Sequence, residues 1–377
     1  MTDHVVKGRC PGAHRPMQSG DGLIMRIRPR LARVSRDQAL GLCHAALSFG
    51  SGLIDLTSRG NLQLRGVAAP SHGVVLDHLY HLGLLDADAV AEGRRNILCT
   101  PLWAVGDLTH RLHDRIVGAL PTLPDLPVKM GVAVDTGPAP MLQGCSADFR
   151  FERDETGGLI LRADGAAAGW PITEDDAADA LRQMAHWFLG TGGRAAGRMA
   201  RHVAQVNVPV AWATRAAAHP TAPVHPGHTT LGPAYGVAFG RVAAQKLVDL
   251  IHRSAARAVR VTPWRVLILD QGRPIADAPD FITDPDDPVL RVHACPGAPQ
   301  CGAARAETHA LARALAPHVA GRVHVSGCAK GCAFPKAADV TLVGRDNDYY
   351  DIIHHGAPWD RPAHRALHKD YILAAIR

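Results

Sequence analysis

Alternating apolar and polar positions outline a first structural unit near the N-terminus. Residues 22–28, GLIMRIR, alternate with a period of two, which predicts a strand. The apolar spacing over residues 35–49, followed by Gly50, predicts a helix. Residues 53–66, LIDLTSRGNLQLRG, then predict two strands joined by a turn.

The second half of the chain repeats this series. Residues 236–240, GVAFG, precede a helical pattern over 241–255 and a strand pair over 258–269, AVRVTPWRVLIL. Three landmark pairs keep the same order at falling offsets of 214, 205 and 196 residues: Gly22 and Gly236, Thr57 and Thr262, Cys99 and Cys295. One duplicated unit shortened in two connections would give this result.

A linker is predicted between the two halves. Residues 218–233, AHPTAPVHPGHTTLGP, are rich in Pro, Gly, Thr and His and have no apolar period. We therefore expect a pseudo-twofold molecule with a site between its halves.

Composition narrows the class of protein. The 377 residues are 47% hydrophobic, enough for a sizeable core and two or three domains. No apolar run approaches about 18 residues, and the start MTDHVVKGRC is not a secretory signal, so we expect no membrane and a reducing, cytoplasmic location. Lys and Arg exceed Asp and Glu by six and aromatics make up 5%. This balance favours an acidic small ligand over nucleic acid.

Four of the eight cysteines form two loop-borne pairs. Cys295 and Cys301 are spaced C-x5-C, and Cys328 and Cys332 are spaced C-x3-C. Structural zinc sites use tighter pairs, whereas wider glycine- and proline-rich loops suit an iron–sulfur cluster. Ordinary buried cysteines and a disulfide framework are the less favoured alternatives. The pattern predicts a 4Fe-4S cluster on these four residues, for which the remaining cysteines are dispensable: Cys10, Cys43, Cys99 and Cys145.

Several cationic residues lie at predicted strand ends or on polar strand faces. They are Arg26, Arg28, Arg59, Arg65, Arg94, Arg95 and Lys129. Exposed Arg and Lys are ordinarily solvated surface residues. Their placement on the sheet favours a ligand instead, and arginine forks bind carboxylates bidentately. The set predicts a polycarboxylate ligand.

These motifs carry a resemblance to a known family. CPGAPQC with GCAKGC resembles the cluster-binding motif of the sulfite and nitrite reductase family. GLIMRIR, TSRGNLQL, RRNILCTP and LPVKMGV resemble, in order, its tetrapyrrole- and anion-binding segments, and the likeness extends from about residue 22 to 344. With RCPGAHRPMQSGDGL and TPWR, the chain is most similar to the branch of aerobic cobalamin biosynthesis that converts precorrin-3A to precorrin-3B.

The resemblance implies a duplicated α+β architecture. Two ferredoxin-like half-domains would form a central barrel-like unit, flanked by two larger α/β domains. The implied boundaries are 1–72 for the first half-domain, 73–217 for a first reductase-like domain, 218–280 for the linker and second half-domain, and 281–377 for a second reductase-like domain that carries the cluster.

The resemblance also implies residue roles. The positions that hold macrocycle carboxylates or the bound anion in sirohaem reductases correspond to Arg26, Arg59, Gln63, Arg95 and Lys129. We add Arg28 and Arg65 as substrate-binding candidates and take Lys129 as the catalytic candidate. The cluster ligands correspond to Cys295, Cys301, Cys328 and Cys332, and Cys332 matches the ligand that also bridges to the sirohaem iron.

Two departures from the family pattern bear on the substrate. The second lysine of a K-F-K pattern is Gly131 here, and Ala329, Lys330 and Gly331 replace a usual Pro-Asn-Gly. The missing lysine weakens the case for sulfite or nitrite and leaves room for a bulkier organic substrate.

The implied reaction is a monooxygenation. Precorrin-3A, a metal-free polycarboxylate, is hydroxylated by dioxygen at the meso carbon between rings A and D, and an acetate side chain closes a lactone. An electron donor is required: reduced ferredoxin, a flavoprotein or NADH. Triplet dioxygen reacts poorly with singlet organic molecules, so a one-electron metal centre is expected. The resemblance implies a non-haem iron, but none of the 22 histidines, the pair His354 and His355 included, indicates its ligands.

Two other functions fit the same residues. One is a sirohaem-dependent sulfite or nitrite reductase, for which sirohaem would be a cofactor. The other is a non-catalytic carrier of a tetrapyrrole or a cluster.

Overall fold

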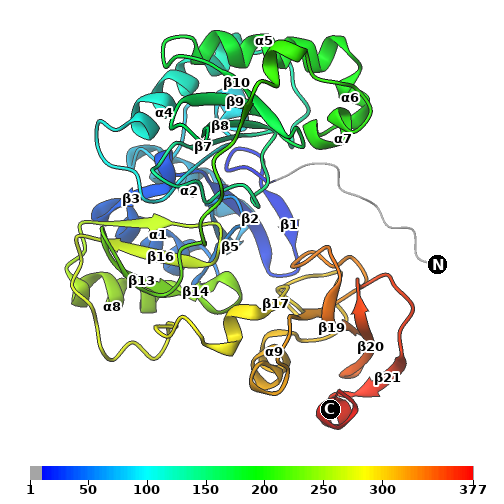
Figure 1. Cartoon of the computed structure of the whole chain (residues 1–377). Helices are drawn as coiled ribbons and strands as arrows, with labels where there is room; N and C mark the ends of the chain where they lie inside the picture. Colours follow the sequence, from blue (N-terminus) through cyan, green and yellow to red (C-terminus); the bar gives the residue numbers. More distant parts are fainter. Residues whose placement is uncertain (1–10, 377) are drawn as a thin grey trace.

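Four β-sheets with helices packed on them make up the described part of the chain. The structure is a computed structural model that describes residues 11–376, and Figure 1 shows the arrangement of its elements. Cys10, predicted to be dispensable for the cluster, lies outside the described residues. None of the described helices combines the length and the apolar character needed to cross a membrane.

The first sheet is the predicted N-terminal unit. Its strand order is β1 (Met17–Ser19), β2 (Gly22–Ile27), β5 (Leu62–Val67), β4 (Leu53–Leu56), β14 (Arg241–Ala243). Helices α1 (Arg36–Phe49) and α2 (His72–His81) contribute Leu42 and Val75 to the core beside this sheet. The helix predicted over 35–49 is confirmed: the Ser35 hydroxyl caps it by accepting from the Gln38 N–H at 3.2 Å, and Gly50 ends it.

The second half-domain repeats this plan. Its sheet has the order β12 (Gly227–Thr229), β13 (Gly232–Gly236), β16 (Val266–Asp270), β15 (Ala258–Val261), β3 (Arg33–Ser35), with helix α8 (Ala244–Ser254). The strand pair predicted over 258–269 is confirmed.

Two local expectations in this half are wrong. Residues 237–240 do not continue a strand, because Phe239 has a φ of 56° in a short 3-10 turn (Ala238–Gly240). The strand of this half, β13, begins at Gly232, so Gly232 rather than Gly236 matches Gly22. Gly232 has a φ of 142° and Gly22 a φ of 124°, and each directly follows a hairpin turn. The last part of the predicted linker, from residue 227, accordingly folds as the β12–β13 hairpin.

The two half-domains exchange one strand each. β14 of the second half pairs with β4 in the first sheet, and β3 of the first half pairs with β15 in the other. Each exchanged strand carries an arginine into an ion pair: Arg241 Nε lies 2.7 Å from Asp55 Oδ1, and Arg33 Nε lies 2.9 Å from Asp270 Oδ2. This reciprocal exchange confirms the predicted pseudo-twofold duplication.

Two further sheets flank this unit, and each contains three adjacent parallel strands. One has the order β11 (Arg215–Ala216), β10 (Ala168–Pro171), β9 (Leu159–Ala163), β8 (Phe149–Arg153), β7 (Val132–Asp135), β6 (Ile97–Cys99). Its segment also contains α3 (Ala89–Arg94), α4 (Leu108–Ala119), α5 (Ala177–Gly190), α6 (Gly193–Ala196) and α7 (Met199–Val203). The other has the order β17 (Val292–Ala294), β18 (Val323–Ser326), β19 (Ala338–Gly344), β20 (Tyr349–Gly356), β21 (His364–His368), with α9 (His309–Leu315) and α10 (Lys369–Ala375).

The strand exchange generates a stability prediction. Asp270 is 4% exposed and accepts from Arg33 and from Arg260, whose Nη2 lies 3.1 Å away. Asp270→Asn should destabilise the fold by about 3–5 kcal/mol, because it leaves two cations without their carboxylate. Urea denaturation would measure the change, with Asp277→Asn on the exposed surface as the control. Equal unfolding midpoints for the two variants would contradict the role given to this ion pair.

Candidate functional site

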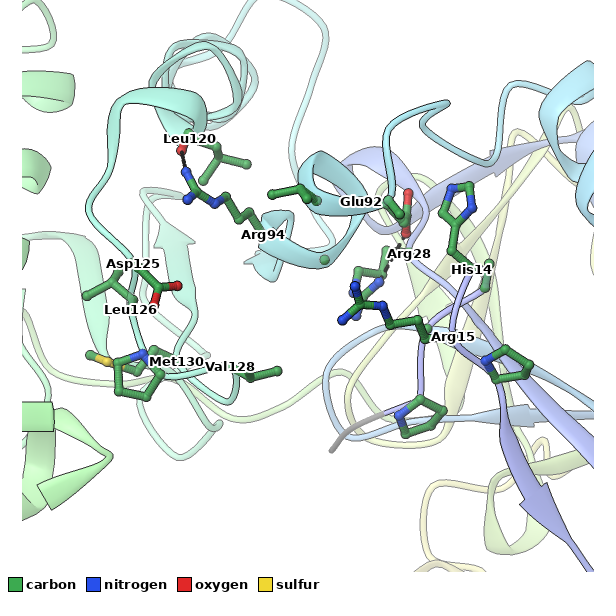
Figure 2. Close-up of a pocket in the computed structure, with 18 of the residues that line it drawn as sticks. His14, Arg15, Arg28, Glu92, Arg94, Leu120, Asp125, Leu126, Val128 and Met130 are labelled. Carbon is green, nitrogen blue, oxygen red and sulfur yellow. Dashed lines mark hydrogen bonds and ion pairs between the residues drawn. The ribbon is translucent and has the colours of Figure 1, made fainter. Parts of the chain in front are cut away.

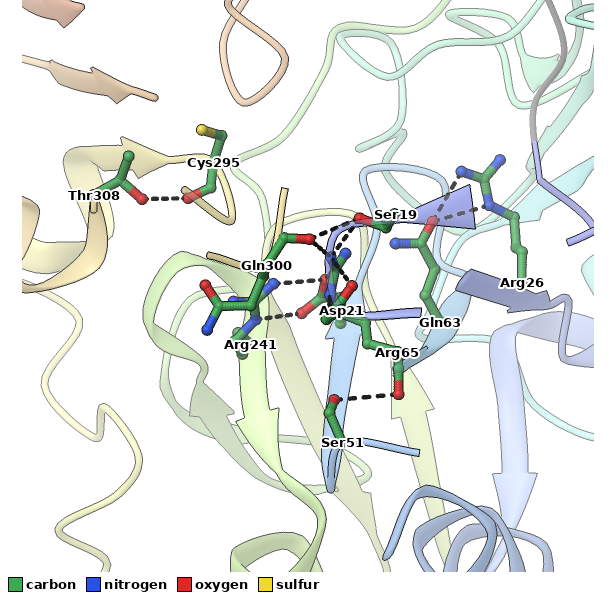
Figure 3. A network of polar contacts seen from close by, with 11 residues as sticks. Ser19, Asp21, Arg26, Ser51, Gln63, Arg65, Arg241, Cys295, Gln300 and Thr308 are labelled. Carbon is green, nitrogen blue, oxygen red and sulfur yellow. Dashed lines mark hydrogen bonds and ion pairs between the residues drawn. The ribbon is translucent and has the colours of Figure 1, made fainter. Parts of the chain in front are cut away.

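A polar row crosses the outer face of the first sheet. Strand register places Arg26 of β2 opposite Gln63 of β5, Gln63 opposite Asp55 of β4, and Asp55 opposite Arg241 of β14. The residues that alternate with them face the core; Met25, Ile27 and Leu64 are at most 1% exposed. The row therefore lies on the opposite face of the sheet, and Figure 3 shows its residues Arg26, Gln63 and Arg241.

The two ends of this row differ. At the β14 end, Asp55 accepts from Arg241 and from Arg65 Nη1 at 3.3 Å, and both Asp55 and Arg65 are buried. At the β2 end, Arg26 Nη2 donates to Gln63 Oε1 at 3.0 Å, and both side chains are only half-buried. A ligand can therefore approach the row from the β2 end.

The four predicted cluster cysteines come from two neighbouring loops. Cys295 follows β17 and Cys328 follows β18, and these two strands are adjacent and parallel. Because the carboxyl ends of parallel strands meet at one sheet edge, the two motif loops meet there too. All seven cysteines within residues 11–376 are free thiols.

The surroundings of the thiols fit a cluster. Burial raises the pKa of Cys295, and the nearby thiols of Cys328 and Cys301 act in the same direction. Burial likewise raises the pKa of Cys332, with the other three thiols adding to the effect. Each of these two thiols therefore feels the charge of other motif cysteines, and the Gly327 N–H donates to Cys295 Sγ at 3.1 Å. A cationic iron cluster would remove the cost of ionising four neighbouring thiols.

The described part of the chain contains no group of side chains suited to a single metal ion. Among residues 11–376, no three His, Cys, Asp or Glu side chains lie close enough together to hold one ion. The described residues thus offer no ligand set for the mononuclear iron that the resemblance implies. His355 is 81% exposed in its side chain and lies 3.6 Å from Asp339.

The first cluster loop is seated on the β1–β2 hairpin. Gln300, between Cys295 and Cys301, offers its carbonyl oxygen to Ser19 Oγ at 2.7 Å and to Arg65 Nη2 at 3.1 Å. A Cβ on Gly20 would lie 2.6 Å from the Pro299 carbonyl oxygen, so only glycine fits at this hairpin position. The hairpin therefore holds this loop against Arg65, which also donates to Asp55 of the polar row.

Three of the predicted substrate-binding arginines lie in buried ion pairs. Arg65 is 2% exposed and is held by Asp21 at 3.0 Å and by Asp55. Arg28 Nη1 lies 3.1 Å from Glu92, and Arg95 lies 2.7 Å from both Glu92 and Asp86. These ion pairs hold neighbouring segments together. The three arginines therefore have a structural role, which strand periodicity could not indicate.

Two of the remaining predicted cations meet at a loop of the neighbouring sheet. Arg59, in the β4–β5 turn, donates through Nη2 to the Lys129 carbonyl oxygen at 3.2 Å and to Ser146 Oγ at 3.4 Å. Lys129 itself is exposed. Sequence reasoning missed two residues here, Ser146 and Arg198, because neither stands in a motif or at the end of a strand.

A cavity of about 840 Å³ lies beside this loop. Figure 2 shows it between the segment that contains His14 and Arg15, helix α3 with Arg94, and the segment that contains Asp125 and Val128. Arg28 alone of the predicted substrate-binding residues lines it. Its volume is within the range of small-molecule pockets, about 300–1,000 Å³.

Known proteins are similar to this chain both in fold and in sequence. The family model described as the nitrite/sulfite reductase ferredoxin-like half domain matches residues 15–81. The solved structure of the Mycobacterium tuberculosis NirA protein matches with a TM-score of 0.65 at 21% identity, covering 94% of this chain and 79% of that one. This match shows the shared fold.

One curated relative is closer in sequence. Precorrin-3B synthase of Sinorhizobium sp is 30% identical over an alignment of 401 positions. The alignment covers 93% of this chain and 83% of that protein. The match confirms the family and the α+β fold class predicted from the cysteine and arginine motifs. The chain therefore belongs to the precorrin-3B synthase family, a family of enzymes built on the fold of nitrite and sulfite reductases.

Proposed function

We propose that the chain converts precorrin-3A to precorrin-3B in cobalamin biosynthesis and that the polar face of the first sheet is its substrate cleft. The observation that carries the proposal is the polar row itself. It offers Arg26 and Gln63 at an accessible end, and Arg65, which is bonded to Asp55 of the row, contacts the loop between Cys295 and Cys301. Carboxylates of a tetrapyrrole would bind along such a row through charge-assisted hydrogen bonds.

The pseudo-equivalent face in the second half-domain supports this choice. There the matching row reads Ala234, Ile268, Arg260 and Arg33 across β13, β16, β15 and β3. Val224, from the connection between the halves, packs with Ala234 and Ile268. Arg260 stacks on the Trp103 ring at 4.3 Å. The β13 and β16 positions of this row are thus apolar and covered, where the first sheet has Arg26 and Gln63, and its Arg260 lies against Trp103.

The proposed reaction consumes one dioxygen, two electrons and two protons. One oxygen atom enters the macrocycle as a hydroxyl, the other leaves as water, and an acetate carboxyl of the substrate closes the lactone. A reduced ferredoxin, a flavoprotein or NADH supplies the electrons. A 4Fe-4S cluster on Cys295, Cys301, Cys328 and Cys332 would pass them on singly. Within this scheme, Arg26 and Arg59 bind carboxylates of the substrate. Loss of Lys129 lowers the turnover rate more than it lowers substrate affinity.

The site is a poor fit for sulfite or nitrite reduction. A Cβ at position 131 would lie 2.5 Å from Asn96 Nδ2 and 2.7 Å from the Asn96 carbonyl oxygen. The second lysine of the reductase pattern therefore cannot be accommodated unless this segment moves. Without that lysine, a small inorganic anion would lack the compact point charge that the reductase pattern provides.

The proposed activity is tested directly. Aerobic incubation of the reconstituted protein with precorrin-3A and a reductant should give precorrin-3B, detected as a mass gain of one oxygen atom, and anaerobic incubation should give none. The isolated protein should contain no stoichiometric sirohaem. Extraction of sirohaem together with sulfite-dependent oxidation of a reduced viologen dye would favour the reductase function instead.

The cluster assignment gives a second prediction. Cys301→Ser and Cys328→Ser should lower the iron and sulfide content, because a hydroxyl oxygen is a poorer iron ligand than a thiolate. Cys145→Ser, outside the two motif loops, is the matched control and should keep the parent's content. Metal and acid-labile sulfide analysis of anaerobically purified protein measures the effect, and full occupancy in either motif variant would refute the assignment.

The accessible end of the polar row gives a third prediction. Arg26→Ala should weaken precorrin-3A binding by about ten- to a hundredfold, since a charged hydrogen bond is worth roughly 1.5–3 kcal/mol. Arg26→Lys should restore only part of the affinity, because a point charge cannot replace the fork. Anaerobic titration observes binding without reaction. Parent-like affinity of the alanine variant would place the substrate elsewhere, with the 840 Å³ cavity as the alternative site.

A further inference from the structure

Arg198 lies beside the loop in which this chain lacks the second lysine. It stands at the N-terminal end of α7, and its Nε lies 2.8 Å from Asp148 Oδ1. The other oxygen of the same carboxylate, Oδ2, accepts from the Gly131 N–H at 3.1 Å. Asp148 is fully buried. One rigid carboxylate thus connects the guanidinium of Arg198 to position 131.

The same guanidinium also converges with that of Arg59. Arg198 Nη2 donates to Ser146 Oγ at 3.0 Å and to the Ala147 carbonyl oxygen at 3.2 Å. Arg59 Nη2 donates to the same Ser146 hydroxyl at 3.4 Å. Two arginines therefore meet at one exposed serine, next to Lys129.

Arg198 has capacity for a further ligand. The bonds to Asp148, Ser146 and Ala147 use Nε and Nη2, and 26% of the side chain remains exposed. Asp148 Oδ1 also accepts from the Met199 N–H at 2.9 Å, so Arg198 is not the sole donor to this carboxylate. A salt bridge that only stabilised the fold would need neither the exposed Arg198 side chain nor its placement near Arg59.

We infer that Arg198 is a further substrate-binding residue, which supplies from α7 the cation that Gly131 lacks and binds a carboxylate of the substrate jointly with Arg59. An arginine suits an organic carboxylate better than a lysine does, because its planar fork matches the two oxygens. The inference rests on the proposed function, and it assigns substrate selection to a residue outside the motifs.

Binding measurements on four variants test the inference. They are Arg198→Met, Arg198→Lys, Ser146→Ala and, as a control for loss of a surface charge, Arg182→Met on α5. Each is titrated anaerobically with precorrin-3A, and its thermal unfolding is followed in parallel. Arg198→Met should raise Kd by about ten- to a hundredfold. Arg198→Lys and Ser146→Ala should raise it by less, and Arg182→Met should leave it unchanged.

The outcomes separate this inference from the proposed function. If the parent protein does not bind precorrin-3A, the proposed function fails. If the parent binds it and a folded Arg198→Met variant binds within twofold of the parent, the inference alone is overturned. Should the methionine variant unfold, Arg198→Lys decides, because it can keep the ion pair to Asp148. A parent-like Kd for that variant would then overturn the inference.

Discussion

The reciprocal exchange of β3 and β14 is the constraint on which the rest of this structure depends. Each exchanged strand completes the sheet of the other half, so neither half can form its full sheet alone. Arg241 meets Asp55 and Arg33 meets Asp270 where the strands cross over. Buried ion pairs of this kind contribute little net stability, but a slipped register would leave charges unpaired. They therefore favour one register.

The two halves use the same positions with opposite charges. In the first sheet the pair is Asp55 on β4 with Arg65 on β5; in the second it is Arg260 on β15 with Asp270 on β16. The inversion changes where the arginine reaches. Arg65 extends to the carbonyl of Gln300 and holds the cluster loop, whereas Arg260 turns toward Trp103 and closes its face. A near-symmetric scaffold thereby acquires, in one half only, a contact to the loop between Cys295 and Cys301.

Sequence alone predicted the features that depend on local spacing. The cysteine pairs, the helix capped by Ser35 and the polar alternation of β2 are each contained in one short segment. Residue roles that depend on tertiary contacts were not predictable. Arg65 and Arg28 resemble ligand-binding arginines in the sequence, yet their carboxylate partners Asp21 and Glu92 come from other segments of the fold. Ser146 and Arg198 are recognised only because folding brings them to Arg59. The match of Gly236 to Gly22 was wrong because Gly236 ends strand β13, which begins at Gly232.

The ends of the polar row set a direction for the proposed substrate. On one side, Arg65 donates to Asp55 of the row and to the Gln300 carbonyl oxygen of the loop between Cys295 and Cys301. A Cβ on Gly20 would collide with the same loop. At the other end lies Arg26, and Arg59 stands in the turn before β5 beside Lys129. A macrocycle with carboxylates on its periphery that lay along this row would be anchored by the arginines away from the buried ion pairs. Under the proposed function, electrons would reach it from the loop that contains Cys295 and Cys301. The cationic groups would thus serve orientation, which matters when one meso carbon among several must meet dioxygen.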